Sequence, residues 1–305
     1  MDIFCNDCPR QCGAKRGDAS PGGICRSPLL PRVGRAAPHF GEEPCISGTR
    51  GSGTVFFTGC NLRCVFCQNR KISRGEGGVP LTVPELRDTM LRLRDQGVHN
   101  INLVTGAHFV RAIAQALEGL ELGIPVVWNS SGYESVESLR RLEGLVQVYL
   151  PDFKYWKSEP AKRYSLAADY PKVAAAAIRE MYRQTGPYRM DEDGMLQRGV
   201  LIRHLVLPGQ DLNAMDVMDF AAEEFPEGSV LFSLMSQYTP MPGLERFPEL
   251  QQRINSETNQ RLIAYMEKLG LEGYCQDVDA ATDEMIPDFD GTGVRNSEFG
   301  MRNSE

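Results

Sequence analysis

Long hydrophobic runs are missing from this 305-residue sequence. No stretch of about 18 apolar residues occurs, so the sequence predicts no transmembrane helix. The first ten residues, MDIFCNDCPR, contain no apolar core of the kind found in a secretory signal. These two absences predict a cytoplasmic protein, where thiols stay reduced. The nine cysteines then favour metal binding over disulfide bonds, because they are odd in number and lie in close clusters.

Positive charge is also scarce. The formal net charge is −7, and no stripe of Lys and Arg runs through the sequence. Because the chain is net negative, we do not expect nucleic acid or an anionic membrane surface as its partner. Histidine is rare too, with four in the chain, and His39, His99 and His204 have no ligand partner at a useful spacing. We expect those three to be packed or hydrogen-bonded.

Short apolar runs alternate with longer amphipathic patterns from residue 51 onward. This alternation predicts an α/β protein with a parallel sheet, and the nearly continuous apolar runs indicate a sheet covered on both faces. Six units are fewer than the eight of a closed barrel, so we expect a partial (β/α)6 TIM-type barrel. A doubly wound sheet is the competing topology, and the absence of a glycine-rich phosphate fingerprint after the first strand counts against it. The expected strands are 53–59, 100–106, 124–130, 145–152, 199–209 and 229–236, and the expected helices are 82–97, 107–120, 135–144, 170–186, 212–225 and 249–270.

Composition divides the chain into three parts. Residues 1–50 are rich in Gly, Pro, Arg and Cys and show little periodicity, which predicts a small Cys-rich N-terminal lobe that binds a metal. Residues 51–290 carry the barrel. Residues 291–305 are polar and contain Arg-Asn-Ser-Glu twice, so we expect a disordered tail.

The stretch GCNLRCVFCQN, residues 59–69, places Cys60, Cys64 and Cys67 directly after the first predicted strand. A structural zinc site uses four ligands. Three thiolates on one loop instead hold three irons of a [4Fe–4S] cube and leave the fourth iron open for another molecule. Three free thiols, or a zinc site that also uses Cys45, are the alternatives.

This C-x3-C-x2-C loop, with Phe66 before its last cysteine, resembles the signature of the radical S-adenosylmethionine (SAM) superfamily. The segment 42–73 is similar to the pyruvate formate-lyase activating enzyme-like, or activase-like, subfamily. The similarity continues in NINLVTGAHF, GYESVESLRRLEG, VYLPDFKY, EMYRQTG, RHLVLPG and IPDFD, from Cys5 to about Asp290. The members we can compare have Thr-Pro-Thr-His where this chain has TGAH, residues 105–108.

The resemblance implies a radical SAM enzyme with a [4Fe–4S] cluster and S-adenosylmethionine as cofactors. Such an enzyme cleaves S-adenosylmethionine reductively to a 5′-deoxyadenosyl radical, which takes hydrogen from a substrate. It also implies an electron donor such as flavodoxin or ferredoxin, and a glycyl-radical enzyme or peptide as substrate. A small-molecule substrate is the alternative within this class. A non-catalytic iron–sulfur or zinc protein is the alternative from another class.

Polar residues stand where the predicted strands end, which is the edge where a (β/α) barrel builds its site. The resemblance implies cofactor contacts at these positions, in addition to Phe66 of the cysteine loop. A tight turn at TGAH, a helix N-cap at NSS and a surface ion pair at PDFK are the plainer alternatives. Arg203 inside a strand needs a partner, and the carboxylate of S-adenosylmethionine is the expected one. The expected contacts are Thr105, Gly106, His108, Asn129, Ser131, Asp152, Lys154, Arg203 and Gln237, with Tyr238 beside the last.

Four further cysteines lie near the N-terminus, at the spacing C-x2-C-x3-C-x12-C. Cys5, Cys8, Cys12 and Cys25 are four soft ligands in a loop-rich segment and predict one tetrahedral metal site. Zinc and a second iron–sulfur cluster both remain open, and free thiols are the alternative. Cys45 and Cys275 stand alone, and we expect both to be buried as small apolar side chains.

Overall fold

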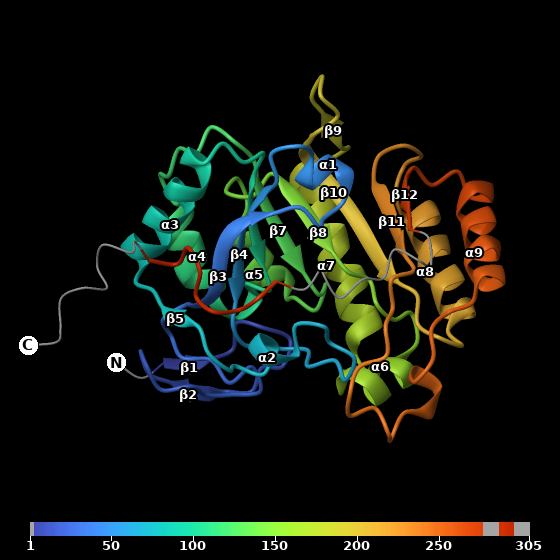
Figure 1. Ribbon diagram of the computed structural model, residues 1–305, viewed down its shortest axis with the longest axis horizontal. Coiled ribbons are helices and arrows are strands. Elements are labelled where there is room, and N and C mark those ends of the chain that lie inside the picture. The colour runs from blue at the N-terminus through green and yellow to red at the C-terminus, as the bar shows by residue number, and fades with distance from the viewer. Residues whose placement is uncertain (1–2, 277–286, 296–305) are drawn as a thin grey trace, which may run out of the picture.

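The computed structural model describes residues 3–276 and 287–295 of the chain. Its centre is a mostly parallel sheet whose strands run in the order β12-β11-β10-β8-β7-β6-β4-β3-β5, and β9 pairs with β10 off this path. Within the described residues the end strands β12 and β5 do not pair, so the sheet is an open, partial barrel (Figure 1). The strands are β3 (Arg32–His39), β4 (Ser52–Phe57), β5 (Val79–Pro80), β6 (Ile101–Val104), β7 (Val126–Ser130), β8 (Val148–Pro151), β9 (Arg189–Met190), β10 (Leu196–Leu205), β11 (Leu231–Met235) and β12 (Gly273–Cys275).

The six predicted strands are all confirmed, as β4, β6, β7, β8, β10 and β11. They lie side by side in chain order and pair in parallel from one to the next. The α/β partial-barrel class is therefore correct, and the doubly wound alternative is wrong. Four strands missed by the periodicity widen the sheet. β3 pairs antiparallel with β4, β5 pairs antiparallel with β3, β9 pairs antiparallel with β10, and β12 pairs parallel with β11.

Helices follow the strands and cover the outer face of the sheet (Figure 1). The capping box predicted at Thr82 and Glu85 is present, with both reciprocal hydrogen bonds. The last predicted helix begins later than expected, because the Asn255 side chain accepts from the Thr258 amide and caps it there. The helices are α1 (Pro44–Ser47), α2 (Arg70–Ser73), α3 (Val83–Asp95), α4 (Val110–Leu117), α5 (Val136–Arg140), α6 (Ser158–Ser165), α7 (Tyr170–Thr185), α8 (Asp211–Glu224) and α9 (Ser256–Lys268), with 3-10 turns η1 (Ala107–Phe109) and η2 (Pro248–Leu250).

The inner face of the sheet has an apolar layer below a polar one. Ile46 of α1 packs with Val127, Val148 and Leu201 in a buried cluster inside the barrel. Because side chains alternate along a strand, the next inward position toward the strand's carboxyl end carries the polar side chain. Arg203 of β10, two residues after Leu201, is one of these. The short helix α1 thus closes the barrel at the amino ends of the strands and leaves the polar layer facing their carboxyl ends.

The boundaries of the predicted lobe and tail need correction. Only the two-stranded sheet of β1 (Ile3–Cys5) and β2 (Ala14–Arg16) and the loop after it stand apart, because residues 32–50 supply β3 and α1 to the barrel. The tail does not begin at residue 291, since Val294 is buried and its carbonyl accepts from Arg92. Residues 296–305 of that prediction lie outside the described residues.

Several single-residue expectations can be checked as well. Cys45 is buried as expected, but Cys275 is exposed, because β12 is an edge strand. His39 packs edge-on against Phe56, and His99 and His204 are hydrogen-bonded, which confirms the predicted roles of these three. No helix in the described part of the chain is long and apolar enough to cross a membrane.

Candidate active site

The three-cysteine loop stands at the carboxyl end of β4, where the chain leaves the sheet in a tight turn. Gly59 has a φ of +85°, and a Cβ on it would lie 2.1 Å from the Ser27 hydroxyl oxygen. Only glycine fits this conformation and this space. The loop is then held from outside, since the Asn61 amide donates to the Tyr133 carbonyl at 2.8 Å and the Val65 N–H donates to the Tyr164 carbonyl at 2.9 Å.

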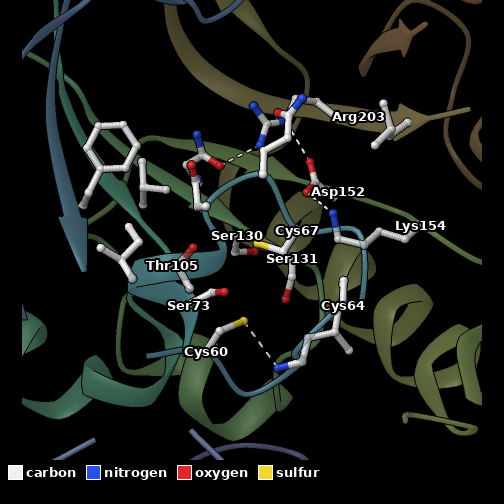
Figure 2. Close-up of a pocket in the computed structure, with 18 of the residues that line it drawn as sticks. Cys60, Cys64, Cys67, Ser73, Thr105, Ser130, Ser131, Asp152, Lys154 and Arg203 are labelled. Carbon is white, nitrogen blue, oxygen red and sulfur yellow. Dashed lines mark hydrogen bonds and ion pairs between the residues drawn. The ribbon is translucent and has the colours of Figure 1, made fainter. Parts of the chain in front are cut away.

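The predicted ligands Cys60, Cys64 and Cys67 line one pocket of about 240 Å³ (Figure 2). Burial, with a smaller contribution from the neighbouring thiols, raises the pKa of Cys64 to about 12 and raises that of Cys67 as well. The free thiols of Cys64 and Cys67 are therefore neutral at pH 7 and poor nucleophiles. A metal that binds them has to displace their protons, which suits a ligand set better than a reactive cysteine.

The sulfur atoms make local contacts. Cys60 Sγ accepts from the Leu62 amide at 3.4 Å, and Cys64 Sγ accepts from the Ser165 hydroxyl at 3.1 Å. Accordingly, in residues 3–276 and 287–295 no three His, Cys, Asp or Glu side chains are already grouped to hold a metal ion. A bound cluster would therefore require these side chains to move closer together.

Phe66 of the loop lines the pocket with an apolar ring. Its ring is buried and meets the Tyr238 ring edge-on, with centroids 6.1 Å apart. The predicted residue Gln237 lines the pocket beside them, whereas Tyr238 turns its hydroxyl to the Leu250 carbonyl. The aromatic position of the motif therefore fixes the cysteine loop to the end of β11.

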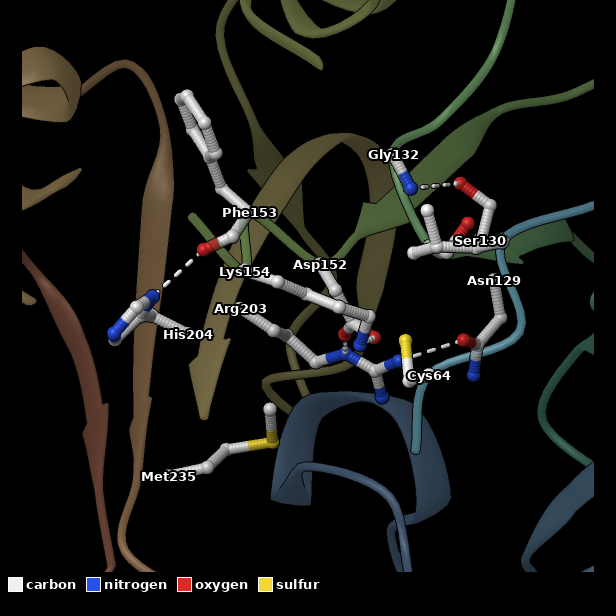
Figure 3. Close-up of polar contacts among 12 residues, drawn as sticks. Cys64, Asn129, Ser130, Gly132, Asp152, Phe153, Lys154, Arg203, His204 and Met235 are labelled. Carbon is white, nitrogen blue, oxygen red and sulfur yellow. Dashed lines mark hydrogen bonds and ion pairs between the residues drawn. The ribbon is translucent and has the colours of Figure 1, made fainter. Parts of the chain in front are cut away.

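Arg203 is the centre of the polar layer, and protein side chains already surround it (Figure 3). Its guanidinium donates to Asp152 at 2.9 Å, to Glu42 at 2.8 Å and to the Asn129 carbonyl oxygen at 2.6 Å. Burial alone would lower the pKa of Arg203, but the neighbouring carboxylates raise it above its ordinary value. The expected carboxylate partner of this arginine is thus supplied by Asp152 and Glu42 of the chain itself.

Lys154 lies nearer to the cysteines, on the other side of Asp152. Its ammonium is 2.5 Å from the second carboxylate oxygen of Asp152. Burial opposes the charge on both side chains. Even so, the positive charges of Arg203 and Lys154 hold the pKa of Asp152 below its ordinary value. In turn, Asp152 and Cys64 hold the pKa of Lys154 above its ordinary value. Both side chains are therefore charged, and the surface ion pair suggested as an alternative is wrong, because each is only about 15% exposed.

Two glutamates that the sequence reasoning missed complete this layer. Glu42 precedes α1 and joins Arg203 to Asn129, whose amide donates to Glu42 at 2.9 Å. Glu43 is buried, and one of its carboxylate oxygens has no hydrogen-bond partner among the residues that the structure describes. Burial raises the pKa of Glu43 despite Arg203 at 3.9 Å. The signal available in the sequence was the adjacent pair Glu-Glu before Pro44, at the start of the segment used for the family resemblance.

The stretch after β6 contributes less than predicted. Thr105 lines the pocket and has a φ of +60°, a strained conformation for a β-branched residue. Gly106 and His108 lie outside the pocket. A Cβ on Gly106 would stand 2.7 Å from Ile113, so this glycine lets the following helix approach the sheet. His108 is buried and hydrogen-bonded to the Thr58 carbonyl at 2.8 Å, and burial lowers its pKa to about 3.

Asn129 lies near the end of β7 and Ser131 directly follows that strand, and both line the pocket. Neither side chain caps the next helix, because Ser135 does so by accepting from the Ser138 amide. Gly132 has a φ of +71°, and a Cβ there would lie 2.4 Å from the Asp152 carbonyl oxygen. This glycine therefore allows the end of β7 to pass close to the end of β8.

The four N-terminal cysteines surround a second, separate cavity. Cys5, Cys8, Cys12 and Cys25 all line it, and its volume is about 10 Å³. Burial raises the pKa of Cys8 to about 11 and raises that of Cys25. The sequence grouping of these cysteines thus corresponds to a grouping in space.

The chain was compared with known proteins. A family model described as the radical SAM superfamily matches residues 54–221. An uncharacterized protein of Methanocaldococcus jannaschii is 31% identical over 244 residues, which cover 77% of this chain and 66% of the relative, just under two thirds.

Two solved structures are more distant. Methylornithine synthase is 15% identical with a TM-score of 0.46, over 71% of this chain and 68% of the other. A domain of pyruvate-formate lyase-activating enzyme from Bacteroides vulgatus is 15% identical with a TM-score of 0.35, over 64% of this chain and 91% of that domain. Neither likeness is close enough to indicate a substrate. The match to the family model spans more than half of the chain and includes the three-cysteine loop, so the chain belongs to the radical SAM superfamily, whose members use a [4Fe–4S] cluster and S-adenosylmethionine.

Proposed function

We propose that this radical SAM enzyme takes a hydrogen atom from a protein or peptide partner, in the manner of the glycyl-radical activating enzymes. The observation that carries the proposal is that several of the segments resembling that subfamily supply side chains to one pocket. Asp152 and Lys154 come from PDFK, and Arg203 comes from RHLVLPG. An electron donor such as flavodoxin or ferredoxin, in the cytoplasm, is part of the proposal.

In this proposal Cys60, Cys64 and Cys67 are the three protein ligands of the cluster. When bound, the cluster and S-adenosylmethionine supply a 5′-deoxyadenosyl radical through one-electron reductive cleavage of the sulfonium. The residues fit the cluster chemically, since three thiols line one pocket at the end of a strand and no fourth cysteine lines it. Nearby apolar side chains such as Leu62 limit the access of water to the pocket. A carbon radical requires this exclusion of water.

Lys154 is the residue that we assign to the carboxylate of S-adenosylmethionine. Within residues 3–276 and 287–295 its ammonium donates to Asp152 alone, and an ammonium has three donors. Asn129 and Ser131 supply further polar contacts at the end of β7. Thr105 adds backbone contacts where its φ of +60° turns the chain at the end of β6.

Arg203 takes a different role from the one that the sequence suggested. All three of its guanidinium nitrogens donate to groups of the chain itself, so we assign it as a positioning residue that orients Asp152 and Asn129. Its replacement should shift the KM for S-adenosylmethionine, whereas the iron content should stay unchanged. Arg203→Lys should restore part of the loss, because it keeps the charge but not the fork of donors.

A small-molecule substrate is the second candidate, and Glu43 favours it. This buried carboxyl lines the pocket with one oxygen that no described residue of the chain meets with a hydrogen bond. Buried polar groups are normally paired, so a donor on a bound molecule is a natural partner for this oxygen. An amine or hydroxyl compound that fits beside Glu43 is the chemistry that this observation favours.

The test starts with anaerobic reconstitution of iron and sulfide in the wild type, Cys64→Ala and Cys275→Ala. The wild type and Cys275→Ala should be brown and should release 5′-deoxyadenosine when dithionite and S-adenosylmethionine are added. Cys64→Ala should do neither. Cys275 is the matched control because it is exposed and lies outside the pocket. Purified pyruvate formate-lyase is then added as the probe for a glycyl-radical partner. A glycyl-radical signal in electron paramagnetic resonance supports the proposal. 5′-Deoxyadenosine release that rises with small amines, without a radical on the added protein, contradicts it and favours the second candidate.

A further inference from the structure

The cavity lined by the four N-terminal cysteines has features of a built ligand site. Cys5, Cys8 and Cys25 are buried, while Cys12 closes the cavity from the exposed side. Gly23, between the last two cysteines in sequence, has a φ of +72°, and a Cβ on it would stand 3.0 Å from Cys12 Sγ and 4.0 Å from Cys25 Sγ. This glycine leaves the space into which two of the sulfur atoms point.

A buried positive charge lies beside these thiols without a carboxylate partner. Arg16 is 2% exposed, and within the described residues it forms no ion pair. Its guanidinium donates to Cys5 Sγ at 3.4 Å and to backbone carbonyls, among them that of His108 at 2.9 Å. A buried charge without a counter-charge is costly. A dianionic metal–tetrathiolate group next to Cys5 would supply that counter-charge.

The size of the cavity limits what it can hold. Its volume of about 10 Å³ matches roughly one water-sized sphere. A single metal ion fits this space, whereas a [4Fe–4S] cube has four irons and four sulfides inside its ring of cysteines. The size therefore favours a single metal ion over a second cluster, the two alternatives that the spacing of the cysteines left open.

We propose that Cys5, Cys8, Cys12 and Cys25 bind one zinc ion in a closed tetrahedral site. Binding converts the four thiols to thiolates and releases four protons, so Zn²⁺ and four thiolates leave a net charge of −2 beside Arg16. Four protein ligands saturate the ion, so the site is structural and takes no substrate. As no three of these side chains are already grouped around a metal position, binding includes a rotation of the cysteine side chains.

The zinc site holds the lobe against the three-cysteine loop of the active site. Arg10, which also lines the small cavity, donates to the Asn61 carbonyl at 2.8 Å and to the Leu62 carbonyl at 3.2 Å, between Cys60 and Cys64. The carbonyl oxygen of Cys25 also lies close to the loop, since a Cβ on Gly59 would be 2.7 Å from it. Loss of the ion should therefore loosen the loop that carries the cluster ligands.

The experiment separates the two metal sites by variants of the full-length chain. The triple variant Cys60→Ala, Cys64→Ala, Cys67→Ala should be colourless and still contain one zinc per chain by elemental analysis. Cys12→Ser should lose that zinc, and Cys12 is chosen because its exposed side chain contributes least to packing. Cys275→Ser, another exposed cysteine, should keep the zinc. Exchange of zinc for Co²⁺ in the triple variant should give the intense visible absorption of a tetrahedral thiolate site, which tests the geometry without any change in the lobe.

Two results would overturn the proposal. A brown triple variant with four irons per chain would place a second cluster at these cysteines. A triple variant without zinc, in which the N-terminal thiols react with a thiol reagent as free groups, would show that no metal is bound there. Neither result affects the assignment of Cys60, Cys64 and Cys67, so the failure of this proposal can be distinguished from failure of the proposed function.

Discussion

Replacing Asp152 by asparagine should destabilise the fold strongly, because it removes the carboxylate between two buried cations. The side chains of Arg203 and Lys154 are 12% and 14% exposed, and Asp152 contacts both. Removal of one partner from a buried ion pair typically costs about 3–5 kcal/mol of unfolding free energy. Glu42 still pairs with Arg203, so most of the loss arises at Lys154. Asp152→Asn, Lys154→Met should therefore recover part of the stability, since it removes the unpaired charge.

The assay is urea unfolding of the reduced, iron-free protein, followed by circular dichroism. Glu137→Gln is the control, because the Glu137–Arg141 pair is exposed and should contribute less than about 1 kcal/mol. The pKa of Asp152 is lowered in the folded state, so its stabilisation is present above about pH 4, the ordinary range of an aspartate, and is lost as the pH falls through the folded value. The difference between wild type and Asp152→Asn should thus shrink in acid. A loss below about 1 kcal/mol at pH 7, equal to the control, would refute this reasoning.

Four further substitutions test separate parts of the site. Gly59→Ala forces a Cβ against Ser27 at a φ of +85°, so the reconstituted protein should bind less iron by elemental analysis. Lys154→Met should keep the cluster colour but weaken S-adenosylmethionine binding by roughly tenfold or more in equilibrium dialysis, and unchanged binding would contradict its assignment. Glu43→Gln should be tolerated, whereas Glu42→Gln should destabilise. Because burial raises the pKa of Glu43, the stability that its protonated form contributes is lost as the pH rises above the ordinary glutamate value. The free energy of unfolding of Glu43→Gln, measured in urea, should therefore increase relative to that of the wild type from pH 4 to pH 7.

The strands and the cysteine loop could be predicted from the sequence because their signals are local. Apolar runs such as 145–152 mark a buried strand, and the spacing of Cys60, Cys64 and Cys67 marks the loop. Parallel strands bring their carboxyl ends together, so Asn129, Asp152 and Lys154 were expected to meet.

The remaining features depend on contacts between distant parts of the chain. The position of Glu42 against Arg203, 161 residues away, follows from where α1 closes the barrel, and no local pattern indicates it. Gly106 was read as a contact to a ligand because a glycine permits close approach. The structure shows that the close approach is to Ile113 and Trp128. His108 was likewise assigned to the pocket, although its partner is the Thr58 carbonyl.

The ligation of the cluster is the central claim, and one measurement tests it most directly. The reconstituted wild type is reduced under anaerobic conditions, and its electron paramagnetic resonance spectrum is recorded before and after addition of S-adenosylmethionine. A [4Fe–4S]⁺ spectrum that changes on addition, with loss of the signal in Cys64→Ala and not in Cys275→Ala, is the predicted result. A spectrum that S-adenosylmethionine leaves unchanged would mean that no iron of the cluster is open to it, and would contradict the account.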